Sequence, residues 1–249
     1  AQLAGALGKK EDFEYFMNRS QNYRNIFNPG TGFFQGRNED GSWHGYGSGF
    51  DPRYIAAERR MYTEANAWQY LWFVPHDVEG LISLLGENFV KKLDELFEQE
   101  PVITGPGAPD VSGMIGEYAH GNEPCHHVAY LYDYAGEYEK TQQRVKQIRE
   151  LYTAEPGGLC GNDDVGQMSA WYVFSDLGFY PVCPGKNEYA LGVPEFSDMT
   201  IHLRGGDLRI SADPERCVSE VLLNGERLKD PFIDYESIHS GGTLVFKSR

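Results

Sequence analysis

GGLCGNDDVGQMSAWYVFSDLGFYP, which runs from Gly157 to Pro181, is the stretch that decides the fold. It places three polar acceptors in a glycine-bracketed loop and follows them with an apolar, aromatic segment that predicts a helix over residues 167–177. The acceptors are Asn162, Asp163 and Asp164. Because Asn and Asp are the commonest N-cap residues, one interpretation is that the cluster only starts the helix. Three acceptors exceed what one cap uses, so the other interpretation gives Asp164 a spare carboxylate in a water-poor, aromatic setting that would tune its basicity.

Length and composition limit the class of protein and its partners. The 249 residues suffice for one large domain, or for one domain with a small appendage. The formal net charge of -15, from 22 basic and 37 acidic residues, argues against nucleic acid and anionic membrane surfaces, because no basic stripe neutralises phosphates. A neutral or cationic ligand, or a metal ion, fits better. Aromatic residues make up 14% of the chain, which favours a pocket where apolar sugar faces stack.

The sequence carries no membrane or targeting segment. No apolar run reaches the roughly 18 residues that a spanning helix needs, and no signal peptide opens the chain. The chain begins with Ala in a segment that already has helical character, so we expect an excised part of a longer protein. The four cysteines show no CxxC spacing, so a zinc site is not indicated.

Apolar residues spaced by three and four predict helices through the first 180 or so residues. The predicted spans are 11–27 with a core-facing side, 63–73, 78–85, 89–97, 124–134 and 138–152. Ordinary amphipathic helices alternate with more apolar, motif-bearing ones, a pattern typical of hairpins that pack into a ring. Lys91 and Lys92 are expected on the solvated side of their helix. Loop aromatics are expected to rim a pocket, namely Trp43, Tyr46 and Phe50.

After Pro181 the apolar pattern changes to a period of two, which predicts short strands. Asn224 and Gly225 are a strong hairpin signal. We therefore expect a small antiparallel unit from about Tyr189 onward, and two domains: a helical segment at 1–185 and a β-rich segment at 186–249 packed on it.

Glu64 stands in a predicted helix that is apolar around nearly its whole circumference, and Trp68 follows one turn later. A carboxyl beside an indole in a dry pocket would have a raised pKa, as a general acid requires. The alternative is a first-turn glutamate that complements the helix dipole.

Polar groups also gather before the helix predicted to begin at Pro124. His120, Asn122 and Glu123 stand there, and oxygens from adjacent positions suit a hard cation such as calcium. His126 and His127 are adjacent, cannot both face one zinc ion, and are expected to be satisfied by hydrogen bonds.

Three motifs carry a family resemblance: YTEANAWQYLWFVPHDVEGL, YAHGNEPCHHVAYLYDYAG and GLCGNDDVGQMSAWYVFSDLGFYPVCPG. In this order they resemble the C-terminal part of the family 92 glycoside hydrolases, the calcium-dependent exo-acting α-mannosidases. The resemblance spans nearly the whole chain. It implies a mainly α fold that is part of an (α/α)6 barrel with a small C-terminal antiparallel β unit. It also implies an N-terminal β-sandwich domain in the same parent protein, and a secreted or periplasmic location.

Residue roles follow from the resemblance motif by motif. Glu64 would be the general acid and Asp164 the general base, with Asn162 in the catalytic group where some members have a second aspartate. Asn122 and Glu123 would hold calcium. The implied substrate-binding residues are Trp68, Gln69, His120, Asp163 and Gln167.

The implied activity is inverting hydrolysis of terminal α-mannosides on N-glycans or mannans. Such chemistry needs the acid and base roughly 6.5 to 9.5 Å apart, on opposite sides of the sugar. A second hypothesis is a catalytically silent sugar-binding or scaffold fragment, because part of a ring leaves inner helices exposed. A third is another helical-ring enzyme, such as a glucosidase or a polysaccharide lyase.

Overall fold

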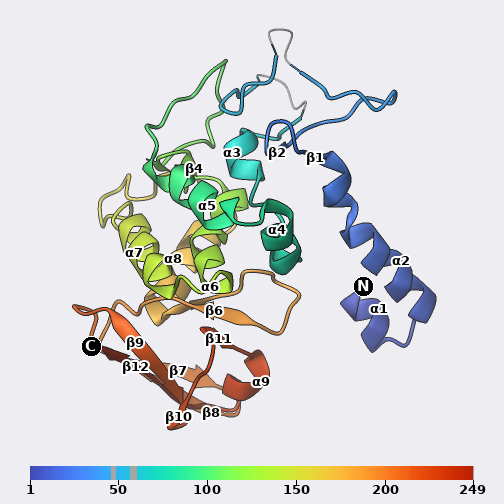
Figure 1. The fold of residues 1–249 in the computed structure, drawn as a ribbon. Helices are drawn as coiled ribbons and strands as arrows, with labels where there is room; N and C mark the ends of the chain where they lie inside the picture. Colours follow the sequence, from blue (N-terminus) through green and yellow to red (C-terminus); the bar gives the residue numbers. More distant parts are fainter. Residues whose placement is uncertain (46–48, 57–60, 249) are drawn as a thin grey trace. The chain divides into compact units, whose positions relative to one another are not determined.

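A computed structural model of the chain describes residues 1–45, 49–56 and 61–248 (Figure 1). The fold divides into two compact units, Ala1–Ala119 and His120–Arg249, and each is described by itself. This division lies at a different place from the predicted boundary between residues 185 and 186, which stays a prediction. In the described part of the chain, no helix is both long and apolar enough to cross a membrane.

In its described residues, the first unit consists of short helices, one 3-10 helix and two small two-stranded sheets (Figure 1). The helices are α1 (Gln2–Ala6), α2 (Lys10–Ser20), η1 (Asn22–Ile26), α3 (Ala67–Tyr70), α4 (Val78–Leu85) and α5 (Asn88–Glu98). The antiparallel strand pairs are β1 (Phe27–Asn28) with β2 (Phe33–Phe34), and β3 (Met114–Ile115) with β4 (Tyr118–Ala119). Buried aromatic and aliphatic side chains of α3, α4, α5 and β4 form its core.

The predicted helix over residues 11–27 is shorter and less buried than expected. Helix α2 ends at Ser20, and η1 and β1 follow it. None of the α2 residues is buried, and Phe16 and Met17 remain 48% and 44% exposed. The expectation that this helix faces a core is therefore wrong: α1 packs against Phe13, but the other large apolar side chains of α2 stay exposed.

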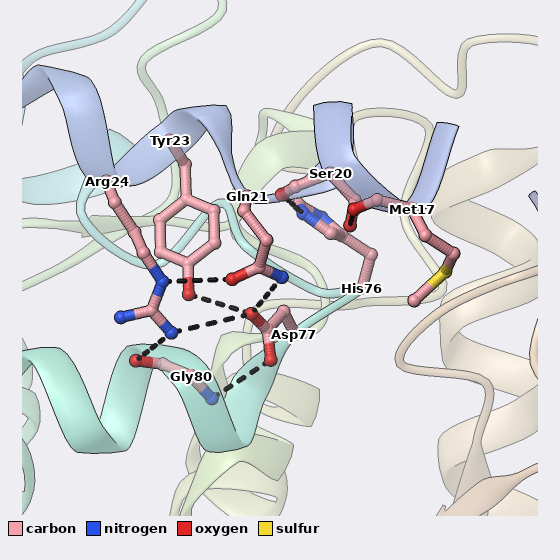
Figure 2. Close-up of polar contacts among 8 residues, drawn as sticks. All are labelled: Met17, Ser20, Gln21, Tyr23, Arg24, His76, Asp77 and Gly80. Atoms are coloured by element: carbon pink, nitrogen blue, oxygen red, sulfur yellow. Dashed lines mark hydrogen bonds and ion pairs between the residues drawn. The ribbon is translucent and has the colours of Figure 1, made fainter. Parts of the chain in front are cut away.

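Asp77 fastens η1 to the start of α4, as Figure 2 shows. Its carboxylate caps α4 by accepting from the Gly80 amide at 3.0 Å. It also accepts from Gln21 Nε2 at 2.9 Å and Tyr23 Oη at 2.8 Å, and Arg24 Nη2 lies 3.8 Å away. Burial raises the pKa of Asp77, but the hydrogen bonds outweigh burial and hold the pKa below its usual value. The carboxylate thus anchors the otherwise exposed N-terminal helices.

Two further expectations for this unit need correction. The helix predicted over 63–73 is reduced to α3, so Glu64 precedes the helix instead of lying in it. Helix α5 agrees with its prediction, but Lys92 is not simply solvated, because its ammonium lies over aromatic rings.

The aromatic loop after β2 supplies internal contacts. Phe50 packs against Phe33 with ring centroids 6.0 Å apart, and Trp43 lies 4.8 Å beneath the guanidinium of Arg37. Tyr46 lies outside the described residues. The expected pocket rim therefore stays a prediction.

The second unit begins with a broken helical stretch. In place of one helix from Pro124 there are η2 (Glu123–Cys125), η3 (Val128–Tyr130) and α6 (Leu131–Tyr134). Helix α7 (Tyr138–Arg149) ends slightly before its predicted end, and α8 (Gln167–Leu177) has the predicted bounds. Trp171 of α8 and Tyr130 of η3 are among its largest fully buried side chains.

The C-terminal strands form two sheets (Figure 1, orange to dark red). The five-stranded sheet has the order β10-β9-β12-β8-β7, with β7 (Asp198–Leu203), β8 (Gly206–Ser211), β9 (Val218–Leu223), β10 (Glu226–Arg227) and β12 (Gly242–Ser248). The smaller sheet pairs β5 (Phe179–Tyr180), β6 (Tyr189–Leu191) and β11 (Phe232–Ile233), and α9 (Tyr235–Ile238) follows β11.

The predicted hairpin is confirmed. Asn224 and Gly225, with φ of 52° and 85°, join β9 to β10 antiparallel. The expectation of a purely antiparallel unit is wrong, because β12 returns to the middle of the sheet and pairs parallel with β8.

Candidate active site

Three successive residues before α8 adopt left-handed backbone conformations. The φ values are 45° at Asp164, 61° at Val165 and 91° at Gly166. Only glycine takes this conformation freely, and each non-glycine residue costs roughly 1–2 kcal/mol there. Val165 is β-branched and its side chain is fully exposed at 110%. Strain of this kind persists where the surroundings impose it and is concentrated at functional sites.

The polar cluster before α8 divides into capping and free groups. Asp163 Oδ1 accepts from both the backbone amide and the hydroxyl of Ser169, each at 2.9 Å. Asp164 and Asn162 are exposed, and neither side chain makes a hydrogen bond or ion pair with any described residue. The inference that one acceptor serves the helix and Asp164 keeps a spare carboxylate is confirmed. The expectation of an aromatic, water-poor enclosure around Asp164 is wrong within this chain, since that carboxylate faces solvent.

This loop packs directly against the segment that holds the other polar cluster. A Cβ added at Gly161 would lie 2.7 Å from the carbonyl oxygen of Gly121, which is closer than real contacts allow. Gly121 stands between His120 and Asn122. The backbone of the Asp164 loop and that of the predicted calcium-binding segment therefore touch.

His120 is fully buried at the base of this contact. Its ring lies 4.4 Å from the Trp171 ring and its Nε2 is 2.6 Å from Tyr152 Oη. Burial, followed by the neighbouring His126, holds the pKa of His120 well below its usual value. A direct contact between His120 and substrate stays a prediction.

Gln167 is oriented by a hydrogen-bonded chain. His126 Nε2 donates to the carbonyl oxygen of His120 at 2.9 Å, so its Nδ1 is the acceptor. Gln167 Nε2 donates to that Nδ1 and to Tyr180 Oη, both at 3.2 Å. Burial lowers the pKa of His126 to about 4, which keeps the ring neutral and this arrangement intact near neutral pH. Within the described chain, Gln167 Oε1 has no hydrogen-bond partner and remains available to a ligand.

Asn122 and Glu123 offer oxygen donors for a cation. Asn122 is buried and Glu123 half-buried, side by side at the start of η2. Amide and carboxylate oxygens are the donor types that calcium prefers, so these residues fit the ion in chemistry. Across residues 1–45, 49–56 and 61–248, no group of three or more His, Cys, Asp or Glu could hold a metal.

In the first unit, Glu64 has the same backbone conformation as Asp164. Its φ is 55°, and it lies three residues before the first residue of α3, as Asp164 does before α8. Glu64 is half-buried. Only four described non-glycine residues have positive φ, and they include both predicted catalytic carboxylates. The other two are Val165 and the hairpin residue Asn224.

A buried capping box fixes the helix that follows Glu64. Asn66 Oδ1 accepts from the Gln69 amide at 3.2 Å, and Gln69 Oε1 accepts from the Asn66 amide at 3.0 Å. Gln69 Nε2 also donates to the carbonyl oxygen of Glu117 at 3.1 Å. Both ends of the Gln69 amide are engaged, so its predicted contact with substrate would have to share these atoms. Trp68 lies beside it and is 8% exposed.

Sequence reasoning missed Glu117. It lies in the turn before β4 and holds Asn66 of the capping box. Its fully buried carboxylate accepts from Asn66 Nδ2 at 3.0 Å and from the Val102 amide at 3.1 Å, and Arg53 Nε lies 3.3 Å away. Burial raises the pKa of Glu117, and these partners oppose the rise. A glutamate inside the run MIGEYA, where every neighbour is apolar or glycine, was the available signal.

Each unit therefore gathers one part of the predicted site. The second brings together Asn162, Asp163, Asp164, His120, Asn122, Glu123 and Gln167. The first holds Glu64 beside Trp68 and Gln69. The separation of Glu64 from Asp164 spans the two units and stays a prediction.

The family model for the "Glycosyl hydrolase family 92 catalytic domain" matches residues 1–248. The chain belongs to this family. The three motifs that carry the family resemblance cover the Glu64 segment with α3 and α4, the His120 segment with α6, and the Asp164 loop with α8.

Three known proteins are similar to nearly the whole length of this chain. The α-mannosidase BT3965 from Bacteroides thetaiotaomicron, solved with mannoimidazole, has 40% identity and a TM-score of 0.92, covering 100% of this chain and 34% of that one. The inverting mannosidase BT2199 from Bacteroides thetaiotaomicron VPI-5482 has 37% identity and a TM-score of 0.83, covering 98% and 35%. An "uncharacterized secreted glycosidase" from Arthroderma benhamiae is 31% identical over 272 residues, which cover 96% of this chain and 33% of that protein. The chain thus spans about a third of the length of these relatives.

Proposed function

We propose that the protein is an inverting exo-α-mannosidase that hydrolyses terminal α-mannosides of N-glycans or mannans. Glu64 is the general acid and Asp164 the general base. Family membership supports the reaction class, and solved relatives include an inverting mannosidase. The observation that carries the residue assignment is the shared left-handed backbone of both carboxylates, each three residues before a helix.

The surroundings of the two carboxylates suit different halves of the reaction. Glu64 is half-buried, and in this proposal its carboxyl donates a proton to the leaving oxygen. Asp164 is exposed and its carboxylate has no hydrogen-bond partner in the described chain, so it can accept a proton from an attacking water. Inversion requires that water to fit between the base and the anomeric carbon, at an acid–base separation of roughly 6.5 to 9.5 Å. Asn162, exposed two residues before Asp164, would orient the same water.

Substrate contacts come from both units in this proposal. Trp68 would stack on the sugar, and the free Oε1 of Gln167 would accept from a sugar hydroxyl. Gln69, His120 and Asp163 complete the proposed binding set, with their hydrogen bonds fixing its shape. Asn122 and Glu123 would hold a calcium ion, which when bound would orient mannose hydroxyls and stabilise charge.

The proposal extends to the parent protein. The helices within residues 1–185 would form part of an (α/α)6 barrel, and residues 186–249 would pack on it. An N-terminal β-sandwich of the same protein would close the pocket. A secreted or periplasmic location is supported by the fungal relative, whose name describes it as secreted.

Substitution of the two carboxylates in the full-length protein tests the assignment. Glu64→Gln and Asp164→Asn should each lower kcat on an α-mannoside by about 10²- to 10⁴-fold, the usual contribution of one acid or base. Asn tolerates left-handed backbone, so Asp164→Asn should remain folded. Proton NMR of the first product should show β-mannose. Asp198→Asn, at an exposed position of β7 outside the proposed site, is the matched control and should leave kcat unchanged.

Retained turnover in Glu64→Gln would contradict the acid assignment, and retained turnover in Asp164→Asn would contradict the base assignment. Initial formation of α-mannose would contradict inversion. A panel of α-linked sugars with no preference for mannose would contradict the substrate class.

A second candidate is a catalytically silent sugar-binding or scaffold fragment. Two observations favour it: Phe16 and Met17 of α2 are exposed, and the chain spans only about a third of the length of its relatives. This candidate predicts no turnover by residues 1–249 alone, even with calcium. Measurable mannosidase activity from these residues would refute it.

A further inference from the structure

Lys92 of α5 places its ammonium over two aromatic rings of the first unit. Nζ lies 3.8 Å from the ring centroid of Phe33 and 4.8 Å from that of Trp68. Among the residues that the structure describes, Lys92 has no hydrogen bond and no ion pair. Its neighbour Lys91 is 73% exposed and lies 3.9 Å from Glu95. Two adjacent lysines on one helix therefore have opposite environments.

The aromatic rings supply the close contacts that compensate the partly buried charge of Lys92. Burial lowers the pKa of Lys92, and the charge of Glu95 opposes that change only in part. An ammonium within about 6 Å of an aromatic ring centroid is attracted by the ring quadrupole, most strongly by indole. The contact thus makes the position of Trp68 depend on Lys92.

Other local features hold the same geometry. The rings of Phe33 and Trp68 meet edge to face, with centroids 4.9 Å apart at 77°. Gly32, at φ 72°, lies beside the lysine, since a Cβ there would stand in van der Waals contact 3.4 Å from Lys92 Cε. The indole of α3 is thereby fixed by groups from β2 and α5.

We propose that Lys92 is a positioning residue for Trp68, and through it for the sugar that Trp68 binds. This inference rests on the proposed function, in which Trp68 stacks on mannose. Trp68 lies in the capped helix that begins three residues after Glu64. Losing the ammonium frees the indole to turn, which weakens sugar binding without removing the acid or the base.

The full-length protein labelled with 5-fluorotryptophan tests the contact directly. This chain contributes four tryptophans to the fluorine spectrum, and Trp68→Phe identifies the resonance of Trp68. Lys92→Met should shift the Trp68 resonance more than the others and raise KM roughly 2- to 10-fold with kcat nearly unchanged. Lys91→Met is the matched control and should change neither. Lys92→Arg keeps the cation and should restore most of the affinity. Equal thermal unfolding midpoints would show that the lysine variants are folded.

An unchanged Trp68 resonance in Lys92→Met would overturn the inference. So would a shifted resonance with an unchanged KM, or an equal effect from Lys91→Met. A wild-type protein inactive on mannosides would overturn the proposed function instead, and the Trp68 resonance would still decide whether Lys92 holds the indole.

Discussion

Glu64 and Asp164 stand at equivalent places in the two units, but their segments are held in opposite ways. Each is left-handed and three residues ahead of a helix. The Glu64 segment is followed by a fully buried Asn66, whose capping box rests on the carboxylate of Glu117. The Asp164 loop is exposed and is held by Asp163 at one end and by backbone packing at Gly161.

The proposed acid is therefore supported by a buried polar network, and the proposed base by an exposed loop. A buried polar network fixes a group rigidly. Removing any one partner lowers stability, because it leaves buried polar groups unpaired. An exposed loop held by one cap and one close backbone contact leaves its carboxylate open to water. We therefore expect the Glu64 segment to depend on buried charge and the Asp164 loop to depend on backbone fit.

The largest expected effect is at Glu117. Glu117→Ala leaves buried donors from Asn66 and the Val102 amide without an acceptor, and Arg53 without its ion-pair partner. The free energy of unfolding should fall by about 3 kcal/mol, measured by urea unfolding followed by tryptophan fluorescence. Glu95→Ala, on the exposed side of α5, is the control and should change stability by less than about 0.5 kcal/mol. Equal losses in both variants would show that the buried network does not hold the Glu64 segment.

The close approach at Gly161 gives the next effect. Gly161→Ala forces a Cβ against the backbone of Gly121 and should cost about 2 kcal/mol, the usual penalty of overpacking. Turnover should fall as well, since the loop must shift. Gly157→Ala is the matched control, because a Cβ there meets nothing within 4 Å. Thermal unfolding and kcat of both variants provide the measurement. If the two variants behave alike, backbone fit does not hold the loop.

Local signals predicted one of the two segments well and the other poorly. Helix α8 has its predicted bounds because glycines bracket a long apolar run. The helix at 63–73 was overestimated, because its apolar run is buried by tertiary packing and only α3 is helical. The exposure of α2 could not be predicted either, since a stripe of apolar residues does not say what covers it.

The candidate site shows the same limit. Motifs predicted the two catalytic carboxylates, whereas the contacts of Glu117 and Lys92 involve residues far away in the sequence. The parallel pairing of β12 with β8 could not be predicted either, because an alternating strand pattern does not specify which strand it pairs with.

Asp163 offers a smaller test of how the Asp164 loop is held. Asp163→Ala removes the acceptor for the Ser169 amide and hydroxyl, so the free energy of unfolding should fall by about 1 kcal/mol, as for other lost caps. Asn162→Ala is the control: its side chain is exposed and makes no hydrogen bond with the described residues, so stability should not change. Urea unfolding distinguishes the two. A larger loss of unfolding free energy in Asn162→Ala would mean that Asn162, and not Asp163, caps α8.

The smallest expected effect is a gain in stability at Val165. Its φ of 61° is unfavourable for a β-branched residue, and its side chain is fully exposed, so Val165→Gly removes strain without removing a contact. The extra freedom of glycine in the unfolded chain offsets part of this gain, leaving about 0.5 kcal/mol. Val173→Gly, at a 56% exposed position inside α8, should instead lose about 1 kcal/mol. If strain at Val165 holds Asp164 in place, Val165→Gly should raise the unfolding midpoint while kcat falls; a rise in both would mean that the left-handed run is a cost of folding with no part in the reaction.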